Sequence, residues 1–264
     1  MCRWAAYIGA DIFLEDIVTR PAHSLIVQSQ SAAKCKTATN GDGFGVAWYG
    51  TRAEPGLYRD VYPAWSDTNL RALAHQVRSG LFLAHVRAST GSAISRNNCH
   101  PFTAGRWSFM HNGQVGGFEH FRRSADMCIP DALYEHRKGA TDSEVLFLLA
   151  LEEGLDTDPK PALECAVTRM EALSRERGCM PHMRLSVAMS DGERLFAARY
   201  SSDHIAPSVF YRWSPHLDGW AVVSEPLEDT GEAWCELKPG QFLTLSREGA
   251  KAEDFVPGGI TQAA

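Results

Sequence analysis

Short apolar or alternating runs, bounded by Gly, Pro or Ser, occur near both ends of the chain and are typical of β-strands. In the first third they predict strands at residues 3–9, 24–28, 44–49 and 81–87. After residue 180 they predict strands at 183–189, 194–200, 209–213, 220–224 and 241–247. Asp191-Gly192 separates the first two of these later runs and predicts a hairpin turn.

Apolar residues at helical spacing gather in the middle of the chain. Asp67 is placed to cap a helix with apolar positions 70, 73, 74 and 77, which Gly80 is expected to end. Residues 142–155 and 161–177 predict two longer helices, and the polar tail from about residue 249 is expected to fray. Strands at both ends and helices between them predict an α+β fold, with two packed antiparallel sheets and helices outside.

Composition narrows the class of protein. The 264 residues are 44% hydrophobic and 22% charged, without repeats, so one domain over residues 1–264 is the simplest expectation. The net charge of −6 argues against a general nucleic-acid or anionic-membrane binder. The longest apolar run, residues 145–151, is far shorter than the ~20 residues of a membrane-spanning helix. We therefore expect neither nucleic acid nor membrane as a partner.

The seven cysteines indicate a cytoplasmic protein with reduced thiols. Their number is odd, and their spacing fits neither a disulfide framework nor a zinc site, so no metal is expected. Acidic residues 11, 15 and 16 stand where a signal peptide would have its cleavage site. The glycine-rich residues 41–45 lack the spacing of a phosphate-binding loop, and no cofactor is expected. Arg122-Arg123 and Arg137-Lys138 are expected on a solvated helix surface.

Cys2 is the first candidate catalytic residue, because an initiator methionine is normally removed before a small residue. Cys2 would then carry the α-amine, whose reference pKa of ~7.7–8.0 leaves roughly a third unprotonated near pH 7.5. One residue would supply both a thiol nucleophile and a nearby base. The alternative is that Cys2 is simply the second residue of a chain.

Three polar clusters follow in the sequence. Residues 83–91 read LAHVRASTG. Arg87, at the end of the predicted strand, is suited to bind a carboxylate with two hydrogen bonds, but it could equally well be an ordinary surface arginine. Residues 109–113 read FMHNG, and Asn112-Gly113 either forms a turn or supplies the two donors of an oxyanion hole. Residues 141–144 read TDSE at a helix start, where Asp142 either caps the helix or holds a substrate ammonium group.

In this order, Cys2, Arg87, Asn112-Gly113 and Asp142 resemble the glutaminase domain of class II glutamine amidotransferases, a branch of the N-terminal nucleophile hydrolases. Supporting motifs are DGFG at 42–45, CHPF at 99–102 and HNG at 111–113. The resemblance spans residues 2 to about 245. It implies a four-layer αββα sandwich of two antiparallel sheets.

The resemblance also implies a site with two parts. The catalytic residues would be Cys2, Asn112 and Gly113. The substrate-binding residues would be Arg87, Thr90, His111 and Asp142. The Cys2 thiol would attack the carboxamide of glutamine, or of a related γ-glutamyl compound, and form a γ-glutamyl thioester while the α-amine moves protons. Asn112 and Gly113 would stabilise the oxyanion, and Arg87 and Asp142 would bind the α-carboxylate and α-ammonium of the small-molecule substrate.

Departures from the family pattern leave three functions open. After Arg87 the chain has Ala-Ser-Thr-Gly, where many members have Trp-Ala-Thr-His. Larger relatives fuse this domain to a synthase that consumes ammonia, so glutamine hydrolysis for a separate synthase subunit is one expectation. The chain also resembles the stand-alone hydrolases of the ergothioneine pathway, which cleave a γ-glutamyl amide of a thiol-derived metabolite. The third expectation is an inactive glutamine-binding regulatory subunit.

Overall fold

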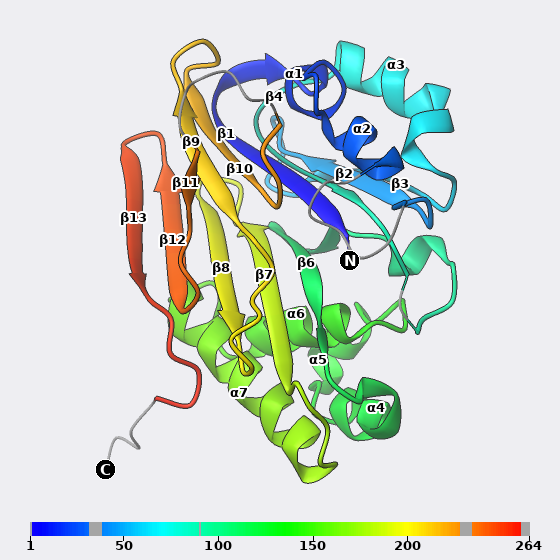
Figure 1. Cartoon of the computed structure of the whole chain (residues 1–264), viewed down its shortest axis with the longest axis vertical. Coiled ribbons are helices and arrows are strands. Elements are labelled where there is room, and N and C mark those ends of the chain that lie inside the picture. Colours follow the sequence, from blue (N-terminus) through cyan, green and yellow to red (C-terminus); the bar gives the residue numbers. More distant parts are fainter. Residues whose placement is uncertain (1, 32–38, 90, 228–233, 260–264) are drawn as a thin grey trace.

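Two antiparallel sheets pack face to face, and each has helices on its outer side (Figure 1). This arrangement comes from a computed structural model that describes residues 2–31, 39–89, 91–227 and 234–259. It confirms the expected four-layer αββα order of helices, sheet, sheet and helices.

The first sheet has the strand order β11-β9-β10-β1-β4-β2-β3. Its strands are β1 (Arg3–Phe13), β2 (Phe44–Trp48), β3 (Gly56–Asp60), β4 (Arg78–Val86), β9 (Phe210–Ser214), β10 (Gly219–Val223) and β11 (Cys235–Glu236). The first seven residues of β1 are buried, as a central strand covered on both faces requires. The sheet therefore places the first part of β1 in the interior of the molecule.

The second sheet has the strand order β13-β12-β8-β7-β6-β5. Its strands are β5 (Phe102–Ala104), β6 (Trp107–Val115), β7 (Met183–Ser190), β8 (Leu195–Ser201), β12 (Gln241–Ser246) and β13 (Gly249–Asp254). The expected hairpin joins β7 to β8, and Gly192 in its turn has φ of +91°. β6 runs beside β7 and contacts β1 of the first sheet.

Helices cover both outer faces. The helices over the first sheet are α1 (Glu15–Val18), α2 (Leu25–Gln30) and α3 (Thr68–Gln76), with the 3₁₀ turns η1 (Ala64–Ser66) and η2 (Arg96–Asn98) in nearby loops. The helical layer of the second sheet contains α4 (Phe118–Asp126), α5 (Asp131–Tyr134), α6 (Asp142–Glu152) and α7 (Pro159–Glu176). α6 is buried from residue 143 to 150 because it lies between the second sheet and α7.

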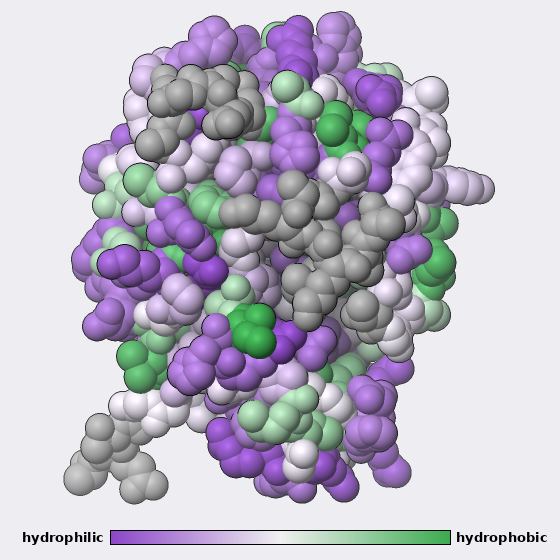
Figure 2. Space-filling view, in the orientation of Figure 1, coloured by the Kyte–Doolittle hydropathy of each residue, from purple (hydrophilic) through white to green (hydrophobic). Residues whose placement is uncertain are grey.

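Three apolar clusters hold these layers together. The cluster between the sheets includes Trp4 and Leu83 from the first sheet and Met110 and Leu243 from the second. Each of the other two clusters lies between one sheet and its own helices. The face shown in Figure 2 is mostly hydrophilic, with small, separate hydrophobic spots. Within the described ranges, no helix is both long and apolar enough to cross a bilayer.

Several local predictions were wrong. Residues 24–28, expected as a strand, form the cap and first part of α2, because the Ser24 hydroxyl accepts the backbone N–H of Val27. Asp67 caps α3 as predicted by accepting the N–H of Leu70 at 2.6 Å, but the helix ends at Gln76 and Gly80 lies within β4. Residues 249–254, expected to fray, form β13, and residues 260–264 lie outside the described ranges.

Candidate active site

Five of the seven residues predicted from the sequence line one cavity of about 420 Å³, a size ordinary for a small-molecule site. These residues are Cys2, Arg87, His111, Gly113 and Asp142. The cavity lies where the start of β1, the end of β4, β6 and the start of α6 meet, near the N-terminus marked in Figure 1. Thr90 lies outside the described residues.

Cys2 lies just before β1, beside the end of β4. In the β1–β4 pair Arg3 is opposite Val86, so Cys2 and Arg87 are adjacent at the end of the ladder. The Cys2 Sγ is 3.6 Å from the carbonyl oxygen of Ala88, and the thiol is partly exposed to the cavity. Cys2 therefore presents a thiol to the cavity at the edge of two buried strands.

Arg87 is 3% exposed and holds the loop that follows β4. Its guanidinium donates to the hydroxyls of Ser92 at 2.7 Å and Ser89 at 3.1 Å, and to backbone carbonyls of Asp42 and Ala93. Among the described residues, no carboxylate forms a salt bridge with Arg87. A buried cation with neutral partners suits a site for an anionic group.

Asn112 and Gly113 lie inside β6 and not in the turn that an Asn-Gly pair usually indicates. Met110 belongs to the cluster between the sheets, and alternate side chains of a strand share a face, so Asn112 faces the first sheet. Its register partner Ser186 accepts the indole N–H of Trp4 at 3.2 Å. This bond joins the two sheets two residues after Cys2. Asn112 therefore lies on the sheet surface that faces the start of β1.

The space at these two positions is narrow. The Asn112 side chain is 1% exposed, and its Oδ1 has no hydrogen-bond partner among the described residues. A Cβ atom at Gly113 would collide with the carbonyl oxygen of Arg184 and with the His111 ring. Glycine is therefore required at position 113 for β6 to approach β7 this closely.

His111 connects β6 to the start of α6. Its Nδ1 is 2.9 Å from the Ser143 hydroxyl and its Nε2 is 3.1 Å from the Arg184 carbonyl oxygen. Burial lowers the pKa of His111, although Asp142 opposes the shift. In the neutral ring, Nε2–H donates to Arg184, and Nδ1 accepts from Ser143. Because both nitrogens have protein partners, the ring shapes the cavity wall without offering a free nitrogen to a ligand.

Asp142 is the first residue of α6, where the helix dipole favours a negative charge. One carboxylate oxygen accepts the N–H of Val115 at 2.8 Å, and the other accepts the N–H of Ser143 at 2.7 Å. The preceding Thr141 caps the helix by accepting the N–H of Glu144. Thr141 therefore caps the helix, and Asp142 lines the cavity; its predicted contact with a substrate ammonium group stays a prediction.

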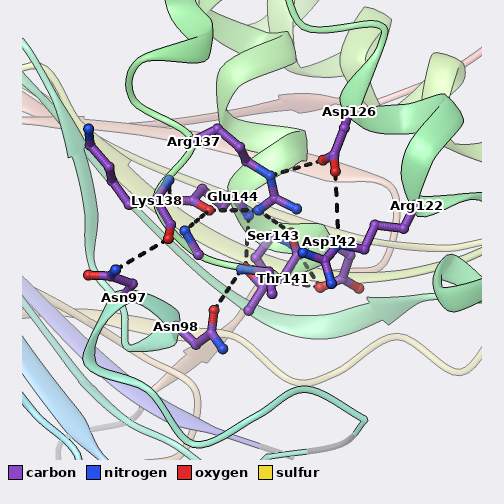
Figure 3. A network of polar contacts seen from close by, with 12 residues as sticks. Asn97, Asn98, Arg122, Asp126, Arg137, Lys138, Thr141, Asp142, Ser143 and Glu144 are labelled. Atoms are coloured by element: carbon purple, nitrogen blue, oxygen red, sulfur yellow. Dashed lines mark hydrogen bonds and ion pairs between the residues drawn. The ribbon is translucent and has the colours of Figure 1, made fainter.

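A buried ion-pair network supports the Asp142 segment (Figure 3). The Arg137 guanidinium is 2.6 Å from the Glu144 carboxylate, and both side chains are 4% exposed. Glu144 also accepts backbone N–H groups of Lys138 and Gly139. Arg137 therefore does not lie on the solvated surface that we expected, whereas Arg122 is half-exposed and lines the cavity.

Three further groups lie near the site, and two of them, Cys99 and His100, belong to the CHPF motif. His85 and His100 are buried with ring centroids 4.3 Å apart, and their four ring nitrogens have no hydrogen-bond partner among the described residues. Burial lowers the pKa of His85 to about 3 and that of His100 well below its usual value. Burial raises the pKa of the Cys99 thiol to about 11. At neutral pH these groups are uncharged, so Cys99 is poorly suited to act as a nucleophile.

Acidic, cysteine and histidine side chains are the usual protein ligands of metal ions. Among the described residues, no group of three or more is arranged to hold a metal ion.

Known proteins resemble this chain over nearly its whole length. The probable glutamine amidotransferase DUG3 of Saccharomyces cerevisiae is 34% identical over 295 residues, which cover 94% of this chain and 82% of that protein. The γ-glutamyl-hercynylcysteine sulfoxide hydrolase of Mycobacterium tuberculosis is 29% identical over 251 residues, or 94% of each chain. A solved glutamine aminotransferase class-II domain protein from Silicibacter pomeroyi is 59% identical, with a TM-score of 0.81 and coverage of 97% and 99%.

The family match agrees with this fold. The model of the class-II glutamine amidotransferases matches residues 19–220. The chain therefore belongs to the class II glutamine amidotransferases, as its motifs predicted, and its homologues are enzymes that act on small molecules. The matched span begins after Cys2, so the role of this residue depends on the geometry described above.

Proposed function

We propose that the protein is an amidohydrolase that uses Cys2 as an N-terminal nucleophile and releases ammonia from glutamine. The observation that carries this proposal is one cavity lined by Cys2, Gly113, Arg87 and Asp142. A nucleophile, an oxyanion donor, a cation and an anion are the four groups that hydrolysis of an amino-acid side-chain amide requires. Removal of Met1 would give Cys2 a free α-amine beside its thiol.

Charge complementarity supports the orientation of the substrate. Arg87 would bind the α-carboxylate, because it is a buried cation without a carboxylate partner among the described residues. Asp142 would bind the α-ammonium, because backbone N–H groups hold its carboxylate at the cavity wall. The γ-carboxamide would then extend toward Cys2, and Thr90 is assigned to the same binding set by the family resemblance.

The chemistry follows from this placement. The Cys2 sulfur attacks the carboxamide carbon, and its proton passes to the α-amine. The tetrahedral oxyanion accepts hydrogen bonds from the Asn112 amide and the Gly113 N–H. Collapse of this intermediate breaks the C–N bond, and ammonia leaves with the proton from the amine. Water activated by the amine then hydrolyses the γ-glutamyl thioester to glutamate and free Cys2. The ammonia would leave the protein or pass to a separate synthase subunit.

Hydrolysis of a γ-glutamyl amide with a larger leaving group is the second candidate. Two observations favour it. The Mycobacterium tuberculosis relative, whose name specifies such a substrate, matches over 94% of both chains. The cavity also continues beyond Arg87 and Asp142 to α4, where Phe118, Glu119 and Arg122 line it. These side chains offer an aromatic face and two opposite charges to a group larger than ammonia.

A matched pair of variants tests the proposal. Purified protein that lacks Met1 is incubated with glutamine and with a panel of γ-glutamyl amides, and ammonia, amines and glutamate are measured. Cys2→Ala should abolish turnover, whereas Cys99→Ala should retain it, because Cys99 does not line the cavity. Turnover of the larger amides with poor turnover of glutamine would support the second candidate. Equal activity of Cys2→Ala and the unmodified protein would overturn both candidates.

A further inference from the structure

A buried arginine stands directly after the proposed nucleophile. Arg3 shares its strand face with Ala5 and Tyr7, which pack against the helices of the first sheet. Its Nε lies 2.9 Å from Glu225 Oε2, and the two side chains are only 2% and 3% exposed. A buried ion pair loses most of its Coulomb gain to desolvation, so stability alone is a weak reason for placing charges here.

The same guanidinium contacts the nucleophilic residue. Arg3 Nη1 donates to the backbone carbonyl of Cys2 at 2.9 Å. The paired part of β1 begins at Arg3, opposite Val86, so Cys2 itself is outside the ladder. Chain ends fray unless they are tied down. The bond from Arg3 fixes the peptide plane after Cys2, and this plane determines where the thiol and the α-nitrogen can lie.

A second layer of contacts holds the ion pair in place. Glu225 Oε1 is 2.6 Å from His23 Nε2, and the Gln28 side-chain amide donates to backbone carbonyls of both Glu225 and His23. Next to Glu225, the Ser224 hydroxyl accepts the N–H of Trp4 at 2.9 Å. The start of β1 is therefore tied to the end of β10 and to α2, on the side of the sheet away from the cavity.

We propose that Arg3, oriented by Glu225, is a positioning residue that holds the main chain of Cys2 so that thiol and α-amine face the substrate. The inference rests on the proposed function of Cys2 as the N-terminal nucleophile. Arg3 does not line the cavity, so it acts through Cys2 and not on the substrate. The planar guanidinium matters because it holds the Glu225 carboxylate and the Cys2 carbonyl in one fixed geometry.

The charge of Arg3 also has a measurable consequence. A nearby cation disfavours protonation of the Cys2 amine, which must be unprotonated to act as a base. The charged or titratable groups near Cys2 are Arg3 and Glu225 behind it, His23 beyond Glu225, and Arg87, Asp142, His111 and His100 at the cavity. Cys99 and Asp42, whose carboxylate accepts the N–H of Ser89, lie nearby without lining the cavity. Removing the charge of Arg3 should shift the acidic limb of the pH profile to higher pH, and removing the charge of Glu225 should shift it to lower pH.

The experiment compares four variants. Arg3→Gln removes both the charge and the planar guanidinium. Arg3→Lys keeps the charge but not the guanidinium, and Glu225→Gln removes the negative charge of the partner. The control is Arg199→Gln, because Arg199 is also buried, pairs with Glu236 at 2.7 Å and donates to a backbone carbonyl, but in the second sheet. For each folded variant, kcat, KM, the pH dependence of kcat/KM and Tm are measured.

The inference predicts a separation of effects. Arg3→Gln should lower kcat by about 10²-fold, as expected for a misplaced reacting group, with KM changed less than about threefold. The midpoint of the acidic limb of its kcat/KM profile should rise by about 1 pH unit, whereas the same midpoint for Glu225→Gln should fall. Arg3→Lys should keep the unmodified midpoint with reduced kcat, and Arg199→Gln should lower Tm alone.

Two results overturn the inference in different ways. If turnover depends on Cys2 but Arg3→Gln and Arg3→Lys lose no more activity than Arg199→Gln, with unchanged midpoints, only the positioning role fails. If Cys2→Ala is as active as the unmodified protein, the proposed function fails and takes the inference with it. Should Arg3→Gln not fold, Arg3→Lys and Glu225→Gln decide the question by the same criteria.

Discussion

Arg137→Met should destabilise the protein strongly, although the side chain lies in a loop between α5 and α6. The change removes one member of an ion pair in which both side chains are 4% exposed. Breaking such a pair typically costs about 3–5 kcal/mol, because the remaining charge stays buried. Glu144 keeps two backbone N–H donors, so we expect the lower end, about 3 kcal/mol.

The expected shift in Tm follows from the size of the chain. With about 2.1 cal/mol/K per residue, 264 residues give an unfolding entropy of about 0.55 kcal/mol/K. A loss of about 3 kcal/mol therefore lowers Tm by about 5 °C in differential scanning calorimetry. Arg137→Met with Glu144→Gln should recover about half of this loss, because the buried carboxylate is gone.

Arg122→Met is the matched control for this prediction. Arg122 also approaches Asp126, but at 3.8 Å and with 48% of its side chain exposed, so the change should cost less than about 1 kcal/mol. If Arg137→Met lowers Tm no more than Arg122→Met does, the assignment of Arg137 to a buried support of the active site is wrong.

Three further changes test other parts of the site. Arg87→Gln should raise KM for the substrate about 10- to 100-fold with a smaller effect on kcat, because a charged hydrogen bond contributes about 1.5–3 kcal/mol; equal losses in kcat would contradict a binding role. Gly113→Ala should lower kcat about 10²-fold because its Cβ collides with Arg184, whereas Gly50→Ala, with no atom within 4 Å, is the neutral control in the same rate assay. The pKa of His85 is about 3 in the fold against ~6.5 in the unfolded chain, so below pH 6.5 the unfolded chain binds more protons. The free energy of unfolding therefore decreases as the pH is lowered, by up to about 1.4 kcal/mol per pH unit. Urea unfolding at several pH values should show that the free energy of unfolding depends less steeply on pH in His85→Gln. An unchanged dependence on pH would refute this account.

Periodicity predicted the long elements because their environment is simple. β1 and β4 are buried on both faces, and α7 has one apolar side, so their patterns match their structures. Residues 24–28 show the limit of the method: a short apolar run fits a strand or a buried helix equally well. The Ser24 cap decides between them, and it becomes informative only once the flanking chain is placed.

The candidate site was predictable as a set of residues but not as a geometry. Cys2, Arg87, Gly113 and Asp142 are separated by up to 140 positions in the sequence, and only the packing of two sheets brings them to one cavity. Neither a turn nor an oxyanion hole could be read from Asn-Gly alone. The position of Asn112 within β6, on the face toward β1, excludes the turn, and the oxyanion hole stays a prediction.

The supporting ion pairs could not be predicted, because each depends on how the chain folds around it. Arg3 pairs with Glu225 across 222 positions. Arg137, which was expected on a solvated helix surface, is buried against Glu144 in the following helix. One signal was present for Arg3: a charged residue within a strand buried on both faces requires a buried partner. His100 was marked only by the CHPF motif, and the burial of His85 and His100 gave no signal, since a neutral buried histidine follows no periodic rule.

The most direct measurement is peptide mass spectrometry of the protein quenched during turnover of its substrate. The account predicts that the N-terminal peptide begins at Cys2 and carries one γ-glutamyl group that hydroxylamine removes, as it does from a thioester. Active protein that retains Met1, or a γ-glutamyl group found on any residue other than Cys2, would contradict it.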